Sequence, residues 1–256
     1  MEGCLCAPIR IEIGTRAGRG LGSARRWHRG GRAVIMAPMT SGLPSLLIGA
    51  RGYAHAGWEG TFYPDNLPPE WRFLFYSHRY PALLMPTHAW GPDGTRLAAF
   101  GDEAPAGFRM VLEISERGLP QMAQVAVWPR PLVAGCLVRL SRLDAAHREP
   151  LAALARALPV TADLRSCPAG CREDLAALGV GVCGRPAAGR APGGPFAVSL
   201  VDRIDRRALG AALQGLMAVE AQAGSALFFC DRATALAGIE EALLLADLLA
   251  GSQARS

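Results

Sequence analysis

The chain has 256 residues, of which 50% are hydrophobic and 19% are charged, a composition that suits one large globular domain or two small ones. All 27 basic side chains are arginine, so a Schiff-base lysine, a phosphate-loop lysine and a lysine general base are excluded. The formal net charge of +5 comes entirely from residues 1–44, because twenty arginines and twenty acids balance over the rest of the chain. A charge excess confined to one terminal segment argues against a nucleic-acid-binding face on the folded part.

Residues 1–44 are rich in glycine and arginine and show little periodicity, which predicts a disordered basic extension. A glycine-rich run inside this segment is similar to a dinucleotide-binding loop. We reject that site because no acid occurs between Glu12 and Glu59, whereas the site needs one about twenty residues on. No secretory signal pattern follows the start and no apolar run is long enough to span a bilayer. A cytoplasmic protein with reduced cysteines and no membrane partner is therefore expected.

From residue 45 onwards, short apolar runs alternate with helical patterns. Strands are expected at 46–50, 82–86, 108–115, 160–164, 180–184, 196–202 and 225–231. A further strand falls either in the run AQVAVWP (123–129) or at 132–140. Helices are expected at 68–80, 151–159, 172–179, 206–222 and 232–251, the last one closed by Gly251.

This alternation predicts parallel strands joined by right-handed crossovers. Eight strands within residues 45–252 fit a small TIM-type (β/α)8 barrel. The connections 87–107 and 184–195 are too short, or too rich in glycine and proline, for full helices. An incomplete barrel therefore stays open as an alternative.

Aromatic residues crowd the stretch after the first expected strand. The segments IGARGY (48–53), WEGTFYP (58–64) and LPPEWRFLFYSHRY (67–80) resemble the opening of the YecE-like family, also called domain of unknown function 72. Members of that family begin with a strand ending in Ile-Gly-Thr-Ser-Gly-Trp, followed by a Trp-x-Gly-x-Phe-Tyr-Pro run and an aromatic-rich helix. The resemblance implies a TIM-type barrel of unknown molecular function.

Three departures from the family pattern imply a divergent branch. The second strand, in PALLMPTHAW, lacks the acid and the amide that family members commonly carry there. Glu113 stands where the family often has a lysine, and Cys230 and Asp231 stand where it often has two asparagines. Chemistry shared by other members need not be retained in this chain.

Barrel enzymes work at the C-terminal ends of their strands. The charged and histidine residues expected at or near those ends are Arg51, His88, Glu113, Arg139, Asp163, Arg165, Asp202 and Asp231. Arginines facing acids there could bind a phosphorylated or carboxylated ligand through paired hydrogen bonds, or they could form ordinary salt bridges between loops. The aromatic loop could be a packed lid over the mouth or a surface on which a sugar or base stacks. The resulting ligand-binding candidates are Arg51, Tyr53, His55, Trp58, Tyr63, Arg139, Asp202 and Asp231.

No catalytic residue, metal or cofactor is predicted. His55 could act as a general acid or base, or it could pack on Trp58. The run CPAGC (167–171) with Cys183 lacks the tight pairs and the fourth ligand of a zinc site.

Three functions stay open after the sequence. The first is an uncharacterised YecE-like barrel that binds or converts a small polar or phosphorylated ligand at its C-terminal mouth. The second is a catalytically inactive barrel that serves as a binding or scaffold protein. The third, a nucleic-acid-processing barrel, is weakened by the neutral domain and by the scarcity of histidine ligands. The sequence does not indicate an oligomeric state.

Overall fold

The computed structural model describes residues 46–90, 96–123, 129, 131–168, 170–202 and 205–253. The expected basic extension, residues 1–44, lies outside these residues. So does most of the first alternative for the fourth strand, residues 124–128.

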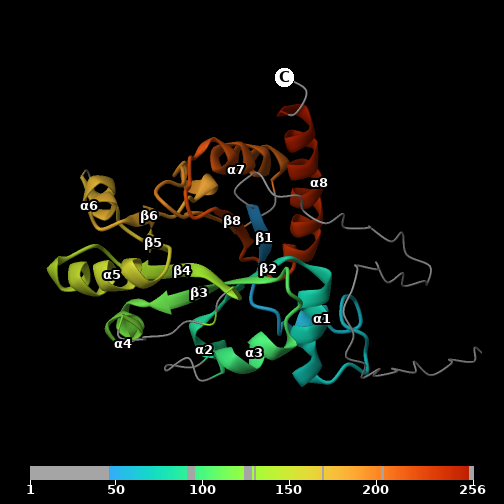
Figure 1. Ribbon diagram of the computed structural model, residues 1–256. Helices are drawn as coiled ribbons and strands as arrows, with labels where there is room; N and C mark the ends of the chain where they lie inside the picture. The colour runs from blue at the N-terminus through green and yellow to red at the C-terminus, as the bar shows by residue number, and fades with distance from the viewer. Residues whose placement is uncertain are drawn as a thin grey trace, which may run out of the picture. The chain divides into compact units, whose positions relative to one another are not determined.

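Eight strands form one parallel sheet (Figure 1). They are β1 (Leu46–Arg51), β2 (Ala82–Met85), β3 (Arg109–Ser115), β4 (Val133–Leu140), β5 (Val160–Leu164), β6 (Val180–Val182), β7 (Ala197–Val201) and β8 (Ser225–Phe229). Their order in the sheet is β6-β5-β4-β3-β2-β1-β8-β7. The fourth strand is therefore the second of the two predicted alternatives.

Gly184, just beyond β6, brings the two ends of this sheet together. Its backbone N donates to the carbonyl of Val198 in β7 at 2.7 Å, and its own carbonyl accepts from Leu200 N at 3.0 Å. A Cβ at this position would lie 2.8 Å from Pro192 Cδ and would also meet the Ser199 hydroxyl, so the approach requires glycine. The sheet is thereby nearly closed, which confirms the predicted TIM-type (β/α)8 barrel.

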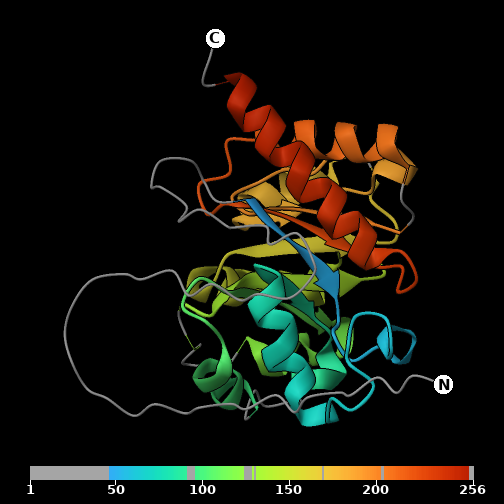
Figure 2. The same ribbon diagram turned by 90° about the vertical axis from the view of Figure 1, so that its right-hand side faces the viewer.

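Helices follow most of the strands and cover the outside of the sheet. They are α1 (Arg72–Arg79), α2 (Thr87–Trp90), α3 (Leu97–Glu103), α4 (Leu119–Met122), α5 (Ala145–Ala157), α6 (Cys171–Ala177), α7 (Arg206–Ala218) and α8 (Ala235–Gln253). Short 3-10 turns are η1 (Ala56–Trp58), η2 (Pro69–Trp71), η3 (Glu116–Gly118) and η4 (Pro186–Ala188). Figure 2 shows α8 and α1 on the outer side of β1. Only η4 connects β6 to β7, as the glycine- and proline-rich sequence there predicted.

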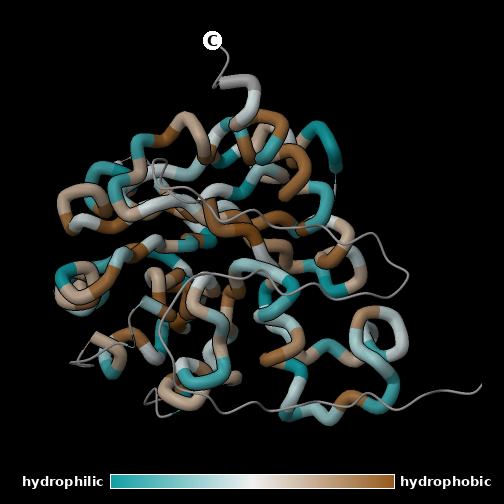
Figure 3. Tube along the Cα trace, turned by 45° about the vertical axis from the view of Figure 1, so that its right-hand side comes forward, coloured by the Kyte–Doolittle hydropathy of each residue, from teal (hydrophilic) through white to brown (hydrophobic). Residues whose placement is uncertain are grey.

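Strand side chains alternate between two apolar layers. One set fills the inside of the barrel, and its largest members are Phe196, Phe228 and Leu84. The other set lies between the strands and the helices and includes Ile48 and Leu112. Strands buried on both faces explain why the sequence shows apolar runs rather than strict alternation with polar residues. Hydrophobic stretches run through the central strands in Figure 3.

Two helix boundaries differ from the sequence prediction. Gly251 does not end the last helix, because α8 continues through it to Gln253 and Gly251 does not take a left-handed conformation. Helix α5 begins at Ala145 rather than Leu151, because the Asp144 carboxylate caps it by accepting from Ala146 N at 3.0 Å. Among the described residues, no helix combines the length and the apolar character needed to cross a membrane.

Candidate functional site

The aromatic loop between β1 and α1 packs its rings against one another. Trp58 and Tyr63 are only 3% and 1% exposed. Trp58 stacks on Tyr76 of α1 with ring centroids 6.2 Å apart, and its Nε1 donates to the Arg232 carbonyl at 2.8 Å. The Tyr63 hydroxyl donates to the Tyr53 carbonyl at 2.6 Å. A ligand could therefore reach the faces of Trp58 and Tyr63 only if these packed rings moved.

His55 is held within the same loop. Its ring meets the Trp58 ring edge-on, with centroids 4.5 Å apart, and its Nε2 lies 3.0 Å from the Arg51 carbonyl. A bond to this carbonyl requires the hydrogen on Nε2. Burial lowers the pKa of the His55 imidazole below its usual value. The ring therefore packs on Trp58 as a neutral side chain.

Asp231 lies at the turn before α8. Its carboxylate accepts from the Thr234 hydroxyl at 2.7 Å and from Ala233 N at 3.3 Å. These contacts satisfy groups at the start of α8, which otherwise lack partners. The Asp231 side chain is thus engaged in ordering the β8–α8 turn.

Charged side chains of alternating sign occupy the carboxyl ends of the strands. Their members are Arg51, Glu113, Arg139, Asp163, Arg185 and Asp202. In the first half of this band, Glu113 of β3 accepts from Arg51 Nε at 2.6 Å and from Arg51 Nη2 at 2.8 Å. The hydrogen bond to Glu113 raises the pKa of Arg51. Arg139 Nε also lies 3.1 Å from the same carboxylate, but it forms no aligned hydrogen bond.

Arg185 organises the second half of the band. Its Nη2 lies 2.6 Å from Asp163 Oδ2, and its Nη1 lies 2.9 Å from Asp202 Oδ2. Asp163 is only 7% exposed, and a buried carboxylate is stable only when paired. Burial alone would lower the pKa of Arg185, but the hydrogen bond and the charge of Asp163 reverse this and raise it. Arg185 therefore stays charged and pairs with both acids.

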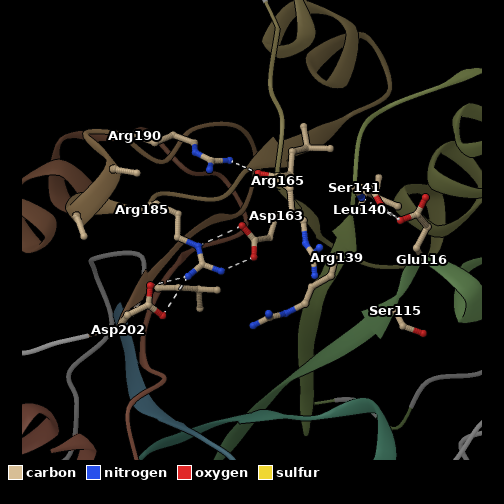
Figure 4. Close-up of a pocket in the computed structure, with 14 residues that line it drawn as sticks. Ser115, Glu116, Arg139, Leu140, Ser141, Asp163, Arg165, Arg185, Arg190 and Asp202 are labelled. Atoms are coloured by element: carbon tan, nitrogen blue, oxygen red, sulfur yellow. Dashed lines mark hydrogen bonds and ion pairs between the residues drawn. The ribbon is translucent and has the colours of Figure 1, made fainter.

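A cavity of about 560 Å³ opens at the carboxyl ends of β3 to β7 (Figure 4). Its charged lining residues are Arg139, Arg165, Arg185, Arg190, Glu116, Asp163 and Asp202. Arg190 Nη1 donates to the Leu164 carbonyl at 2.6 Å. The Arg165 guanidinium forms no hydrogen bond or ion pair with any side chain in the part of the chain that the structure describes. The cavity therefore contains arginine donors that no acid neutralises.

Glu116 is the acid of this cavity that no arginine contacts within the described residues. Its Oε2 accepts from the Ser141 hydroxyl at 2.6 Å and from Ser141 N at 2.9 Å, which lowers the pKa of Glu116. Its Oε1 lies 3.3 Å from His147 Nε2. The other ring nitrogen of His147 lies 3.0 Å from Asp144 at the start of α5. A chain of polar side chains thus leads from α5 to the cavity.

The structure separates the eight predicted ligand candidates into two groups. Arg139 and Asp202 line the cavity. Arg51 belongs to the same charged band and contacts the Glu113 carboxylate that Arg139 also approaches. The remaining candidates, in the aromatic loop and the β8–α8 turn, are Tyr53, His55, Trp58, Tyr63 and Asp231. Their part in binding a ligand stays a prediction.

Sequence reasoning missed several residues of the cavity. These are Glu116, Ser141, Arg185 and Arg190, together with His147 behind them. Arg185 directly follows the predicted strand 180–184, so its position at a strand end was a usable signal. No sequence pattern indicated Arg190, because it lies in the connection between β6 and β7 and reaches Leu164 at the end of β5 only through the path of that loop. Within the described ranges, no three histidine, cysteine or acidic side chains are placed to hold a metal ion.

The comparisons with known proteins support the fold. No family model and no curated protein matches the sequence. The structure is similar to a DUF72 family protein of Thermotoga maritima, with a TM-score of 0.58 and 12% identity over 80% of this chain and 98% of that one. It is also similar to a DUF72 family protein of Enterococcus faecalis, with a TM-score of 0.54 and 11% identity over 80% of this chain and 97% of that one. The fold of this chain is therefore the one seen in DUF72 family proteins, as the residues of the aromatic loop predicted.

Proposed function

We propose that the protein binds a small polar, anionic compound in the cavity at the carboxyl ends of β3 to β7. The observation that carries this proposal is the lining of the cavity by four arginines, one of which has no side-chain partner within the described residues. The volume of about 560 Å³ falls in the range of small-molecule sites. Guanidinium groups present several N–H donors in a plane, which suits carboxylate and phosphate groups.

The alternative that these arginines only form salt bridges between loops accounts for part of the site. Arg185 is fully engaged by Asp163 and Asp202, so it fits that alternative. Arg165 does not fit that alternative, because the charge of an arginine without an acid partner does not stabilise the fold. A bound anion would supply the missing partner.

A barrel that binds without catalysis remains the second candidate. Leu84 and Phe228 are fully buried inside the barrel, so the interior beneath the mouth is filled. The neighbouring Met85 points into the outer layer and adds no polar group to the mouth. Below the cavity, the second strand thus offers no side chain for chemistry.

Thermal-shift measurements test the proposal. The full-length protein is screened against sugar phosphates, nucleotides and dicarboxylates, and then compared with Arg165→Ala and with Arg156→Ala. Arg156 is exposed near the end of α5. Its replacement therefore removes one positive charge, as Arg165→Ala does, but at a position away from the carboxyl ends of the strands. We expect one class of compound to raise the Tm of the wild type and of Arg156→Ala, but not of Arg165→Ala. No response from any compound, or equal responses in all three proteins, would reject the site.

A further inference from the structure

We infer that the ligand is a phosphate ester of a sugar or other polyol, with its phosphoryl group held among Arg139, Arg165 and Arg190. This inference rests on the proposed function and narrows it to one class of compound. The cavity has arginines in its middle and an exposed acid at each end, and these two kinds of group match the two parts of such a molecule. Arg139 and Arg165 lie between Asp202 and Glu116 in Figure 4.

The middle of the cavity carries guanidinium donors in excess of acids. Residue Arg139 of β4 pairs in register with Asp163 of β5, so Arg165, two residues further on, points to the same side of the sheet. Arg165 has no acid partner within the described residues, and Arg139 shares the single charge of Glu113 with Arg51. Neighbouring cations repel one another unless an anion lies between them.

A phosphoryl group fits this middle part of the cavity better than a single carboxylate does. It carries a charge close to −2 at neutral pH and offers three acceptor oxygens. Within the described residues, the Arg165 side chain donates no hydrogen bond and the Arg190 side chain donates one, to the Leu164 carbonyl. The terminal nitrogens of Arg139 also donate none there, whereas its buried Nε lies 3.1 Å from Glu113. Together these donors can surround several oxygens of one anion.

The two ends of the cavity carry exposed carboxylates, Glu116 just after β3 and Asp202 just after β7. The Asp202 side chain is 54% exposed and the Glu116 side chain is 36% exposed. The Ser141 hydrogen bonds lower the pKa of Glu116, so this group stays an acceptor. Carboxylates accept hydrogen bonds from hydroxyl groups and repel a second anion. Each end therefore favours the hydroxyl groups of a polyol over the far end of a dicarboxylate.

Small apolar side chains line the part of the cavity formed by η4 and β7. Ala187 and Ala188 come from the η4 segment, and Leu200 comes from β7. Such a wall accommodates the C–H face of a short carbon chain without competing for its hydroxyl groups. The arrangement thus has a place for each part of a polyol phosphate.

Isothermal titration calorimetry on the full-length protein tests the inference. The probes are ribose 5-phosphate, glucose 6-phosphate, glycerol 3-phosphate, inorganic phosphate, ribose and malate. We expect at least one ester to bind about tenfold more tightly than inorganic phosphate, and ribose and malate to bind more weakly than that ester. Arg165→Ala should weaken both the ester and inorganic phosphate about tenfold or more. Glu116→Gln, which keeps the size of the side chain, should weaken the ester but leave inorganic phosphate unchanged.

The outcomes separate this inference from the proposed function. If no probe binds, the proposed function fails and the inference fails with it. If malate binds as tightly as every ester, or if no ester exceeds inorganic phosphate, the anion site stands but the polyol phosphate is rejected. The same rejection follows if Glu116→Gln weakens inorganic phosphate as much as the ester. Thermal unfolding of each variant, with Arg156→Ala as the charge control, shows whether a loss of binding comes from a loss of fold.

Discussion

Arg51 at the end of β1 and Glu113 in β3 meet across the end of the intervening strand β2, through two hydrogen bonds of 2.6 and 2.8 Å. Strand β2 ends at Met85, and no charged side chain of its own comes between them. The pair therefore ties together two strands that do not touch through their backbones. The same carboxylate reaches Arg139 on β4, so one buried acid links three strand ends.

Removing the charge of Glu113 should destabilise the barrel. Glu113→Gln keeps the size of the side chain but leaves two arginines facing a neutral amide. We expect a loss of about 1–2 kcal/mol in the free energy of unfolding, measured with urea. Glu59→Gln is the matched control, because Glu59 pairs with Arg72 at 2.6 Å on the surface, where its side chain is 51% exposed. That change should cost about 0–1 kcal/mol, and an equal cost for both variants would contradict the role given to Glu113.

Closure of the barrel at Gly184 predicts an intolerance to side chains there. Gly184→Ala places a Cβ against Pro192 and Ser199, so the hydrogen bonds to Val198 and Leu200 must lengthen or break. We expect a loss of about 1–3 kcal/mol in the free energy of unfolding. Gly210→Ala in α7 meets no atom within 4 Å and should be neutral or stabilising, because alanine favours a helix. A neutral Gly184→Ala would show that the close approach is not needed.

The hydroxyl of Tyr76 connects α1 to the sheet. It accepts from Ala50 N at 2.8 Å and donates to the Ala82 carbonyl at 3.1 Å, at a site with 0% exposure. Tyr76→Phe leaves two buried backbone groups without this partner, so we expect a loss of about 1–3 kcal/mol in urea unfolding. Tyr53→Phe is the control, because the Tyr53 hydroxyl makes no hydrogen bond within the described residues. Equal losses in the two variants would show that the Tyr76 hydroxyl is replaceable.

The buried tyrosines also predict how stability depends on alkaline pH. Burial raises the pKa of Tyr76, and it raises the pKa of Tyr80 to about 12. Unfolded tyrosines ionise near pH 10, so between about pH 10 and the folded pKa the unfolded state has released protons that the folded state still holds. Stability is therefore unaffected by these groups below about pH 10 and falls as the pH rises above it. Urea midpoints at about pH 9 and pH 11 should fall less steeply for Tyr76→Phe than for the wild type; parallel slopes would contradict this.

The fold was accessible from the sequence because its strands are short apolar runs bounded by turn residues. The strand at 160–164 was predicted with its correct ends, since a proline precedes it and polar residues follow. Helix boundaries were less accessible. The helix was expected from Leu151, directly after Pro150, yet the Asp144 cap stabilises a turn and a half of helix before that proline. Gly251 could continue α8 because glycine ends a helix only when it adopts a left-handed conformation.

The candidate site was accessible only in part. Arg139 and Asp202 were predicted to face the mouth because side chains near strand ends do so in barrels. Arg190 reaches the site from a loop, and His147 reaches it from the first turn of α5. The spacing of apolar residues does not predict the path of either segment. The packing of the aromatic loop was more accessible. Its rings left two interpretations open, a packed lid and a stacking surface for a ligand, and the structure packs Trp58 and Tyr63 within the loop as in the first.

At the start of α5, the contribution of a helix cap to stability can be separated from that of a charge. The Asp144 carboxylate accepts from Ala146 N, and it also lies 3.0 Å from His147 Nδ1. Asp144→Asn keeps a side-chain oxygen for the cap and removes only the charge, whereas Asp144→Ala removes both. We expect Asn to cost about 0–1 kcal/mol in urea unfolding, because ion pairs near the surface contribute little, and Ala to cost about 0.5–2 kcal/mol more. If the Asn variant were as unstable as the Ala variant, the charge of Asp144 facing His147 would stabilise the start of α5, and the cap would not.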